Sequence, residues 1–407
     1  MSAMDDRVLD VFQNVADGPQ REAALLNDQS VRAVAFHLPQ FHPIPENDEW
    51  WGKGFTEWAN VVKAKPRFRG HYQPHLPADL GFYDLRLPET RTAQAELAAR
   101  YGITGFCYYH YWFNGRQVLQ RPVNEIWQSG EPDFAFCLCW ANENWTRKWD
   151  GQNDAVLLEQ RYAHEDDVAH IRSLIPMFMD ARYIRVDERP LFMVYRASQL
   201  PDPEKTAETW RREAERAGLK GLFLVRAESF WDEIGDPRKI GFDAGLQFQP
   251  QWPRIAHLRV YRRKWWHVRR LGTHERWLRE NSVYDYEELV ETMLAEPPPE
   301  YPRISCVCPG WDNSPRRGKN AAFLVNSSPE GYERWLHALV ERQTTRLKLN
   351  PRDGGFSTDS LVFINAWNEW GEGNHLEPCQ KWGRKYLEAT QKALGAVRTP
   401  RVEYAGR

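Results

Sequence analysis

Short apolar runs that alternate with helical segments constrain the fold of this chain more than any other feature. Strands that alternate with helices imply parallel strands joined by crossover helices, and eight such units predict an α/β fold of the (β/α)8 TIM-barrel type. An open doubly wound sheet is the alternative, and the lack of a G-x-G-x-x-G after the first run weakens its dinucleotide-binding form. The eight apolar runs are residues 31–37, 103–109, 134–140, 191–195, 222–225, 244–248, 304–307 and 361–364. The helical patterns are residues 88–100, 165–179, 203–217, 286–295, 329–343 and 382–394.

The length of 407 residues suits a single barrel with long loops at its C-terminal face. We expect the catalytic barrel to span residues 31–397, with an N-terminal extension (1–30) and a tail (398–407). The first crossover, residues 38–87, is rich in Pro, His and Trp and is predicted to form a lid or wall. Residues 254–279 form a basic insertion with interleaved Trp. This insertion is either an exposed helix or a peripheral contact with an anionic membrane or a lipid-linked glycan.

Composition excludes several classes of protein. Charged residues make up 27% and hydrophobic residues 42%, which excludes a disordered chain, a coiled coil and a collagen. A net charge of -2 argues against a general nucleic-acid binder. No signal peptide and no membrane-spanning run is visible, and the six cysteines fit buried strand thiols, so we expect a cytoplasmic protein without a metal or cofactor. The chain is unusual in its 19 Trp, 16 Tyr and 19 Phe.

The strongest local signal follows the eighth apolar run. The segment N-A-W-N-E-W-G-E-G-N-H-L-E-P, residues 365–378, places Glu369 and Glu372 three positions apart between Trp and Gly residues. Active sites of TIM barrels lie at the C-terminal ends of the strands. Two carboxylates in an apolar setting repel each other, and their pKa values separate, which is what glycoside hydrolysis requires. A solvated acidic loop is the alternative interpretation.

Four segments together resemble the WbsX-like family. They are HLPQFHPIPENDEWWGKGFTEW (37–58), GITGFCYYHYWFNG (102–115), CLCWANENWTRKWDG (137–151) and INAWNEWGEGNHLEP (364–378). The similarity spans roughly residues 31–394. That family is similar in turn to glycoside hydrolase family 99, the endo-α-mannosidases, mainly through the motif after the eighth run.

The resemblance implies a retaining glycoside hydrolase that cleaves an α-linked, mannose-like polysaccharide with participation of the sugar 2-hydroxyl. Glu369 corresponds to the base that deprotonates this hydroxyl, and Glu372 to the acid/base that protonates the leaving group and then activates water. Gly371 stands where the mannosidases have His, so the match to their motif is limited to Glu369, Trp370, Glu372 and Gly373 and does not identify the substrate. The family is also described as glycosyltransferases of cell-surface polysaccharide (O-antigen, capsule, lipopolysaccharide) biosynthesis, so a transferase or transglycosylase is the first alternative. A non-catalytic glycan-binding barrel is the second.

Polar and aromatic residues that follow the predicted strands are candidates for substrate binding. Alternation within the second strand sends Tyr109 and Tyr111 to one side and His110 to the other. Glu143 either binds a sugar hydroxyl or pairs with Arg147 or Lys148, and Glu57 also falls at a predicted strand end. Sugar rings stack on aromatic rings, so we interpret the Trp surplus as a wall for sugar rings. The candidates are His37, His42, Tyr109, His110, Tyr111, Trp112, Trp140, Asn142, Glu143, Asn144, Glu228, Gln249, Trp311, Asp312, Asn365, Trp367, Asn368 and Trp370.

Overall fold

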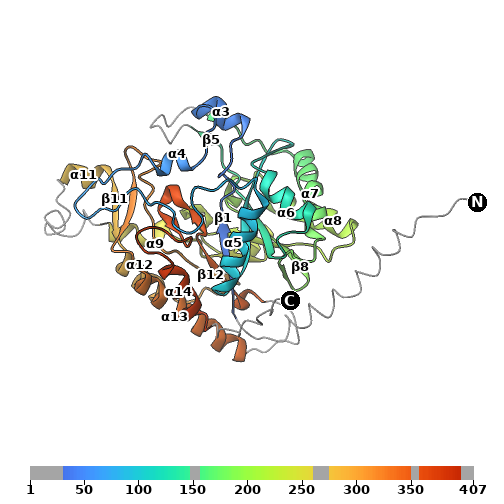
Figure 1. Cartoon of the computed structure of the whole chain (residues 1–407). Helices are drawn as coiled ribbons and strands as arrows, with labels where there is room; N and C mark the ends of the chain where they lie inside the picture. Colours follow the sequence, from blue (N-terminus) through green and yellow to red (C-terminus); the bar gives the residue numbers. More distant parts are fainter. Residues whose placement is uncertain (1–30, 147–155, 260–274, 350–356, 396–407) are drawn as a thin grey trace, which may run out of the picture.

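The computed structural model of the chain describes residues 31–146, 156–259, 275–349 and 357–395 (Figure 1). The predicted N-terminal extension, the predicted tail and most of the basic insertion lie outside these described residues.

Eight parallel strands close into a barrel, which confirms the predicted (β/α)8 fold. Each strand pairs in parallel with its neighbours, and the ring closes because β1 pairs with both β2 and β14. All eight predicted strands are present, with ends shifted by a few residues. They are β1 (Arg32–His37), β2 (Ile103–Phe113), β4 (Ala135–Trp140), β8 (Arg189–Val194), β9 (Phe223–Ala227), β10 (Ala244–Leu246), β12 (Arg303–Val307) and β14 (Leu361–Ile364).

Helices surround the barrel, and the six predicted ones are all found. Pro88 occupies the first turn of its helix, where a missing N–H is harmless, and Gly102 with φ 86° follows the helix end. The six are α5 (Pro88–Arg100), α7 (His164–Phe178), α8 (Pro203–Arg216), α12 (Tyr286–Ala295), α13 (Pro329–Leu349) and α14 (Lys385–Ala393). The sequence analysis does not predict α6 (Arg121–Ser129), which begins with Pro122 in its first turn and ends at Gly130 in the left-handed conformation.

Smaller elements decorate the barrel. The first crossover contains α3 (Pro45–Trp51) and α4 (Trp58–Val61), and α9 (Trp252–Ile255) and α11 (Glu275–Glu280) lie between β10 and β12 in the sequence. The short strands are β3 (Arg116–Val118), β5 (Trp145–Thr146), β6 (Val156–Leu158), β7 (Arg185–Val186), β11 (Ser282–Asp285), β13 (Ala322–Val325), β15 (Asn368–Glu369) and β16 (Asn374–His375). The 3-10 turns are η2 (Ala197–Gln199), η3 (Trp231–Glu233), η4 (Pro237–Ile240), η5 (Ala256–Leu258), η7 (Thr358–Ser360) and η8 (Trp370–Glu372).

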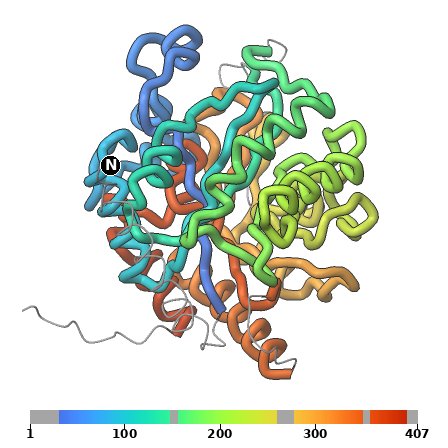
Figure 2. Tube along the Cα trace, turned by 90° about the vertical axis from the view of Figure 1, so that its right-hand side faces the viewer, coloured from blue at the N-terminus to red at the C-terminus, as the bar shows by residue number. Residues whose placement is uncertain are grey.

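One hydrophobic core includes both the interior of the barrel and the layer between the strands and the surrounding helices. The first and last strands of the barrel, β1 and β14, pair with each other in its wall and appear as the blue and orange-red segments near the middle of Figure 2. All six cysteines are buried and unpaired with one another, which confirms their interpretation as small buried residues. Within the described ranges, no helix has both the length and the apolar character that a membrane crossing requires.

Candidate functional site

The segment after β14 folds back on itself at the C-terminal end of the barrel. Strands β15 and β16 pair antiparallel; Glu369 ends β15, and the 3-10 turn η8 that follows it ends at Glu372. Gly373 ends the turn with φ 57°, a left-handed conformation that glycine adopts without strain. Asn368 anchors the segment to the end of β1, because its side chain accepts a hydrogen bond from the amide of Leu38 at 2.7 Å.

A single guanidinium lies between three carboxylates. Arg316, from the loop after β12, donates from Nη2 to Glu369 at 2.8 Å and contacts Glu372 through Nη1 at 2.9 Å. Its Nε donates to Glu57, from the first crossover, at 2.7 Å. Chain segments that are far apart in sequence therefore meet at one cluster of charges. The positive charge at its centre is the guanidinium, and within the ranges that the structure describes no group of His, Cys, Asp and Glu side chains is arranged to hold a metal ion.

Burial changes the ionisation of this cluster. It raises the pKa of Glu369 to about 8, in opposition to Arg316 and with a further rise from Glu372. Burial likewise raises the pKa of Glu372, again in opposition to Arg316. Although burial alone lowers the pKa of Arg316, the three carboxylates hold it well above its ordinary value, so the guanidinium stays charged. The two carboxylates therefore retain a proton more readily than exposed glutamates do.

Gly371 makes room for this arrangement. A Cβ atom on Gly371 would overlap Oε1 of Glu57 and would lie 2.8 Å from Nε of Arg316. No residue with a side chain fits at this position while Glu57 and Arg316 keep their places. The difference from the mannosidase motif at this position thus has a structural counterpart, because a buried Glu57 fills the space.

Three tyrosines at the strand ends lie close enough to the carboxylates to interact with them electrostatically. Tyr109 stacks on Phe36 inside the barrel, with ring centroids 5.5 Å apart, and interacts electrostatically with Glu369. Tyr111 interacts with Glu369 as well, and Tyr195, just after β8, interacts with Glu372. Burial raises the pKa of all three phenols, so they stay neutral hydrogen-bonding groups. The alternation along β2 places Tyr109 and Tyr111 on this inner side, as the sequence predicts.

Asp312 supports the same turn from the β12 side. Its amide donates to the carbonyl oxygen of Glu372 at 2.5 Å. Its carboxylate lies 2.6 Å from Nε2 of His71 and accepts a hydrogen bond from Gln73. Burial raises the pKa of Asp312, but the bonds from His71, Gln73 and Ser314 outweigh it and hold the pKa below its usual value. Asp312 is therefore an ionised anchor next to the carboxylate pair.

Several predicted substrate-binding residues point into the layer between strands and helices. His37 contacts Gln94 of α5 at 3.2 Å, and His110 contacts His170 of α7 at 2.9 Å. Trp112 donates to Asp166 of α7 and stacks on His170. Because His110 and Trp112 are even-numbered positions of β2, alternation places them opposite Tyr109 and Tyr111.

Other predicted residues hold the loops together. Asn142 accepts from the amide of Arg196 at 2.8 Å, and Asn144 accepts from the amide of Gln160 at 2.6 Å. Glu143 pairs with Arg196 at 3.0 Å, whereas its predicted partners 147 and 148 lie outside the described residues.

Three more of the predicted polar residues bond to protein groups away from the carboxylate pair. Glu228 accepts from the hydroxyl of Tyr301 at 2.7 Å. Asn365 donates to the carbonyl of Gln249 at 2.6 Å. His42 contacts the carbonyl of Pro39 through Nδ1 at 2.8 Å. Each of these bonds fixes a loop.

The interpretation of the Trp surplus as a wall for sugar rings is wrong for four residues. Trp112, Trp140, Trp367 and Trp370 are 5%, 1%, 0% and 1% exposed, so they belong to the core. A position after a strand does not reveal whether a side chain turns outward or packs under the loop. Trp145, Trp252 and Trp311 are half-buried and keep a surface that a ligand can reach.

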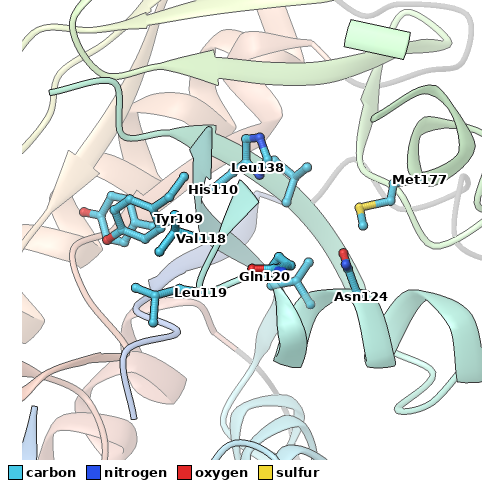
Figure 3. A pocket seen from close by; sticks show the side chains of 10 residues that line it. Tyr109, His110, Val118, Leu119, Gln120, Asn124, Leu138 and Met177 are labelled. Atoms are coloured by element: carbon cyan, nitrogen blue, oxygen red, sulfur yellow. The ribbon is translucent and has the colours of Figure 1, made fainter. Parts of the chain in front are cut away.

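A small cavity lies behind β2, between β3 and α6, and Figure 3 shows its lining residues, with Asn124 and Met177 on the side opposite Tyr109. Its volume is about 10 Å³, about the space of one water molecule, and its lining includes none of the three glutamates and no part of Arg316. It is a packing defect behind the site.

Arg316 was not among the predicted site residues, and Glu57 was predicted only to lie at a strand end. Residues 57 and 316 are 259 positions apart, and no local pattern links them. The available signal was Gly371 between two glutamates, because a glycine there indicates that another group occupies the space.

Comparisons with known proteins agree with this architecture. The profile of the family described as "Glycosyltransferase WbsX" matches residues 33–390. The chain belongs to this family. It is also 42% identical over 382 residues to a protein described as "Uncharacterized protein WxcX" from Xanthomonas campestris pv. campestris strain B100. The match covers 94% of this chain and 52% of that protein, so the chain spans about half the length of this relative.

Solved structures with the same fold include the GH99 endo-α-mannosidase from Bacteroides thetaiotaomicron in complex with bis-tris propane. It has a TM-score of 0.52 at 13% identity, over 90% of this chain and 97% of that one. A structure titled "Glycoside hydrolase-like protein" has a TM-score of 0.51 at 12% identity, over 90% of this chain and 94% of that one. At such identity the likeness concerns the fold.

Proposed function

We propose that this WbsX-family chain is a carbohydrate-active enzyme, specifically a retaining glycoside hydrolase that acts on an α-linked, mannose-like polysaccharide. The observation that carries the proposal is the pair Glu369 and Glu372 at the C-terminal end of the barrel, both bonded to one guanidinium, with side chains 7% and 20% exposed. Burial raises the pKa of both, so each takes up a proton more readily than an exposed glutamate does, which supports a role in proton transfer. Glycoside hydrolysis requires one carboxyl group that donates a proton and one that accepts one.

In the proposed reaction Glu369 removes the proton from the sugar 2-hydroxyl. The 2-oxygen attacks the anomeric carbon and forms a 1,2-anhydro sugar, while the bond to the leaving oxygen breaks and Glu372 donates its proton to that oxygen. Glu372 then takes a proton from water, the hydroxide opens the anhydro ring, and the proton on Glu369 returns to the 2-oxygen. The configuration at the anomeric carbon is retained. The motif Glu369-Trp370-Gly371-Glu372 supports these roles through its likeness to the family 99 motif.

A transferase or transglycosylase is the second candidate, and the description of the family as glycosyltransferases favours it. The same Glu372 would accept a proton from a sugar hydroxyl in place of water. Such an enzyme would act in the assembly of cell-surface polysaccharide.

One experiment separates these candidates. The chain is incubated with defined α-linked oligosaccharides and lipid-linked oligosaccharides, and anomeric NMR follows the products with and without an added acceptor sugar. A hydrolase gives a reducing sugar whose first-formed anomer is retained, and a transferase gives an extended acceptor. Inverted product would contradict the mechanism, and glycan binding without turnover in wild type and in Glu372→Gln would favour a binding barrel.

Cytoplasmic location and membrane contact through residues 254–279 remain predictions. Flotation of the chain with liposomes of neutral and of anionic lipid tests the second. We expect binding only to the anionic vesicles, because the insertion is basic. Equal, negligible binding to both would remove it.

A further inference from the structure

We propose that Glu57 and Arg316 form a positioning unit for the reaction, in which Glu57 fixes the guanidinium and the guanidinium fixes Glu369 and Glu372 relative to each other. The inference rests on the proposed function for its catalytic meaning. Its structural content stands on the contacts of four side chains and on Gly371.

The guanidinium is suited to this task because it is planar and rigid. Its three nitrogens point in different directions, and each reaches a different carboxylate at 2.7–2.9 Å. The side chain of Arg316 is 10% exposed, so its charge is not screened as a surface charge is. Because Glu369 and Glu372 bond to the same rigid guanidinium, the distance between their carboxylates is fixed.

Of the three carboxylates that contact Arg316, that of Glu57 is the most deeply buried. Its side chain is 0% exposed, and Oε2 has no hydrogen-bond partner among the described residues. A buried carboxylate with an unpaired oxygen is unfavourable for folding, because its desolvation is only partly offset. Its retention beside Arg316 is explained if it holds the guanidinium in place.

Gly371 couples this unit to the turn that carries both glutamates. Glu57 fills the space that a Cβ on Gly371 would require. Glu57, Arg316 and the η8 turn therefore fit together only in this combination. A substitution at residue 371 should act through Glu57.

The loop of Arg316 is also held independently of the glutamates. Arg67 donates to the carbonyl oxygens of Gly318, Ser314 and Arg317 at 2.7, 2.9 and 2.7 Å. These bonds fix the loop backbone, so removal of the Arg316 head group should leave the loop in place. The effect of such a variant can then be ascribed to the loss of the positive charge and of the hydrogen bonds from the planar guanidinium.

The groups that face Glu369 and Glu372 determine what the loss of Arg316 does. They are Glu57, Arg316, Arg317, Tyr109, Tyr111 and Tyr195. The tyrosines are neutral, Glu57 raises the pKa of both carboxyls, and Arg316 is the main opposing charge. Loss of Arg316 therefore raises both pKa values.

The test measures the titration of 13C-labelled glutamate carboxyls by NMR in the full chain without substrate, with signals assigned through Glu369→Gln and Glu372→Gln. In Arg316→Gln we expect the titrations of both carboxyls to move up by about one pH unit or more. Arg316→Lys restores the charge but not the fork, so it should return the titrations towards those of the wild type while kcat stays reduced more than tenfold. In Glu57→Gln, kcat should fall by a larger factor than that by which KM changes. Arg182→Gln removes another buried arginine, paired with Asp180, and should leave the titrations unchanged.

Unchanged carboxyl titrations in folded Arg316→Gln would overturn the proposal. If that variant does not fold, Arg316→Lys and Glu57→Gln decide, and wild-type kcat in both would overturn it. A second measurement uses thermal unfolding: Gly371→Ala should lower the melting temperature less in a Glu57→Ala background than in wild type. Equal decreases would contradict the coupling. Because titration and unfolding need no substrate, a failure of the hydrolase proposal would show separately, as absent turnover with shifted titrations.

Discussion

The indole Nε1 of Trp370 donates a hydrogen bond to Oε2 of Glu377 at 2.6 Å. The hydroxyl of Tyr83 donates to the same oxygen at 2.8 Å, and Gln94 donates to Oε1 at 2.7 Å. Trp370 also stacks on His375, with ring centroids 3.7 Å apart. The turn with the two candidate catalytic glutamates is thus fastened to a buried carboxylate behind it.

This contact predicts a pH-dependent stability. Burial raises the pKa of Glu377 from 4.5 to about 7, although the bonds from Trp370, Gln94 and Tyr83 lower it. The folded chain holds this proton more tightly than the unfolded chain, so its stabilisation is complete below pH 4.5 and is lost as the pH rises through 7. Glu377→Gln removes the titration. Its free energy of unfolding relative to wild type should therefore rise by about 3 kcal/mol between pH 4.5 and 8.

Denaturant unfolding at several pH values measures this difference. Glu388→Gln is the matched control, because it makes the same substitution at an exposed position on α14. A Glu377→Gln curve parallel to that of the wild type would show that Glu377 titrates normally.

The carboxylate pair gives the second prediction. Glu369→Gln and Glu372→Gln should each lower kcat by at least about a hundredfold, because neither amide can exchange a proton with the sugar. Both variants should stay folded, because glutamine keeps the shape of the side chain and each carboxyl already retains a proton more readily than an exposed glutamate does. Turnover assays and thermal unfolding provide the two measurements. Wild-type kcat in either variant would remove that residue from the mechanism.

The fold and this pair were predictable because their signals are local. Alternation in β2, Pro88 at a helix start and the E-x-x-E spacing each lie within a short stretch of sequence. Arg316 and Glu57 were not predictable in the same way, because their contact depends on closure of the barrel across 259 residues. The short helix α6 was missed, although Pro122 in its first turn and Gly130 after its end mark both of its boundaries in the sequence.

Asp312 gives the third prediction. Asp312→Asn keeps the shape of the side chain but loses its negative charge beside His71, and only one oxygen remains to accept hydrogen bonds. The backbone N–H of Asp312 donates to the carbonyl oxygen of Glu372. A shift of residue 312 in the variant should therefore also displace Glu372. We expect a loss of stability of about 2–4 kcal/mol together with a lower kcat, measured by chemical unfolding and turnover. The double variant with His71→Gln should lose less than the sum of the two single losses, and additive losses would show that the two side chains act separately.

The tryptophans show where position along the sequence was insufficient. Trp140 and Trp311 both follow barrel strands, but Trp140 is 1% exposed and packs on His170 and Trp210, whereas Trp311 is half-buried. The direction of each side chain depends on the loop path, which composition does not encode. Of these two residues, only Trp311 has a surface that a ligand can reach, and it directly precedes Asp312 in the sequence.

This contrast gives the fourth prediction. Trp140→Ala should lose about 3–5 kcal/mol of stability, because it empties a core position, and should keep the KM of the wild type in whatever fraction stays folded. Trp311→Ala should lose far less stability but raise KM for an α-mannan oligosaccharide several-fold, because it removes a ring on which a sugar can stack. Unfolding curves and initial rates on the two proteins measure both quantities. Trp231→Ala is the matched control, since Trp231 is 70% exposed and its loss leaves no cavity. An unchanged KM in Trp311→Ala would indicate that the sugar does not bind on this side of the barrel. Trp145 and Tyr111, whose ring centroids are 5.3 Å apart, would then be the next candidates for stacking.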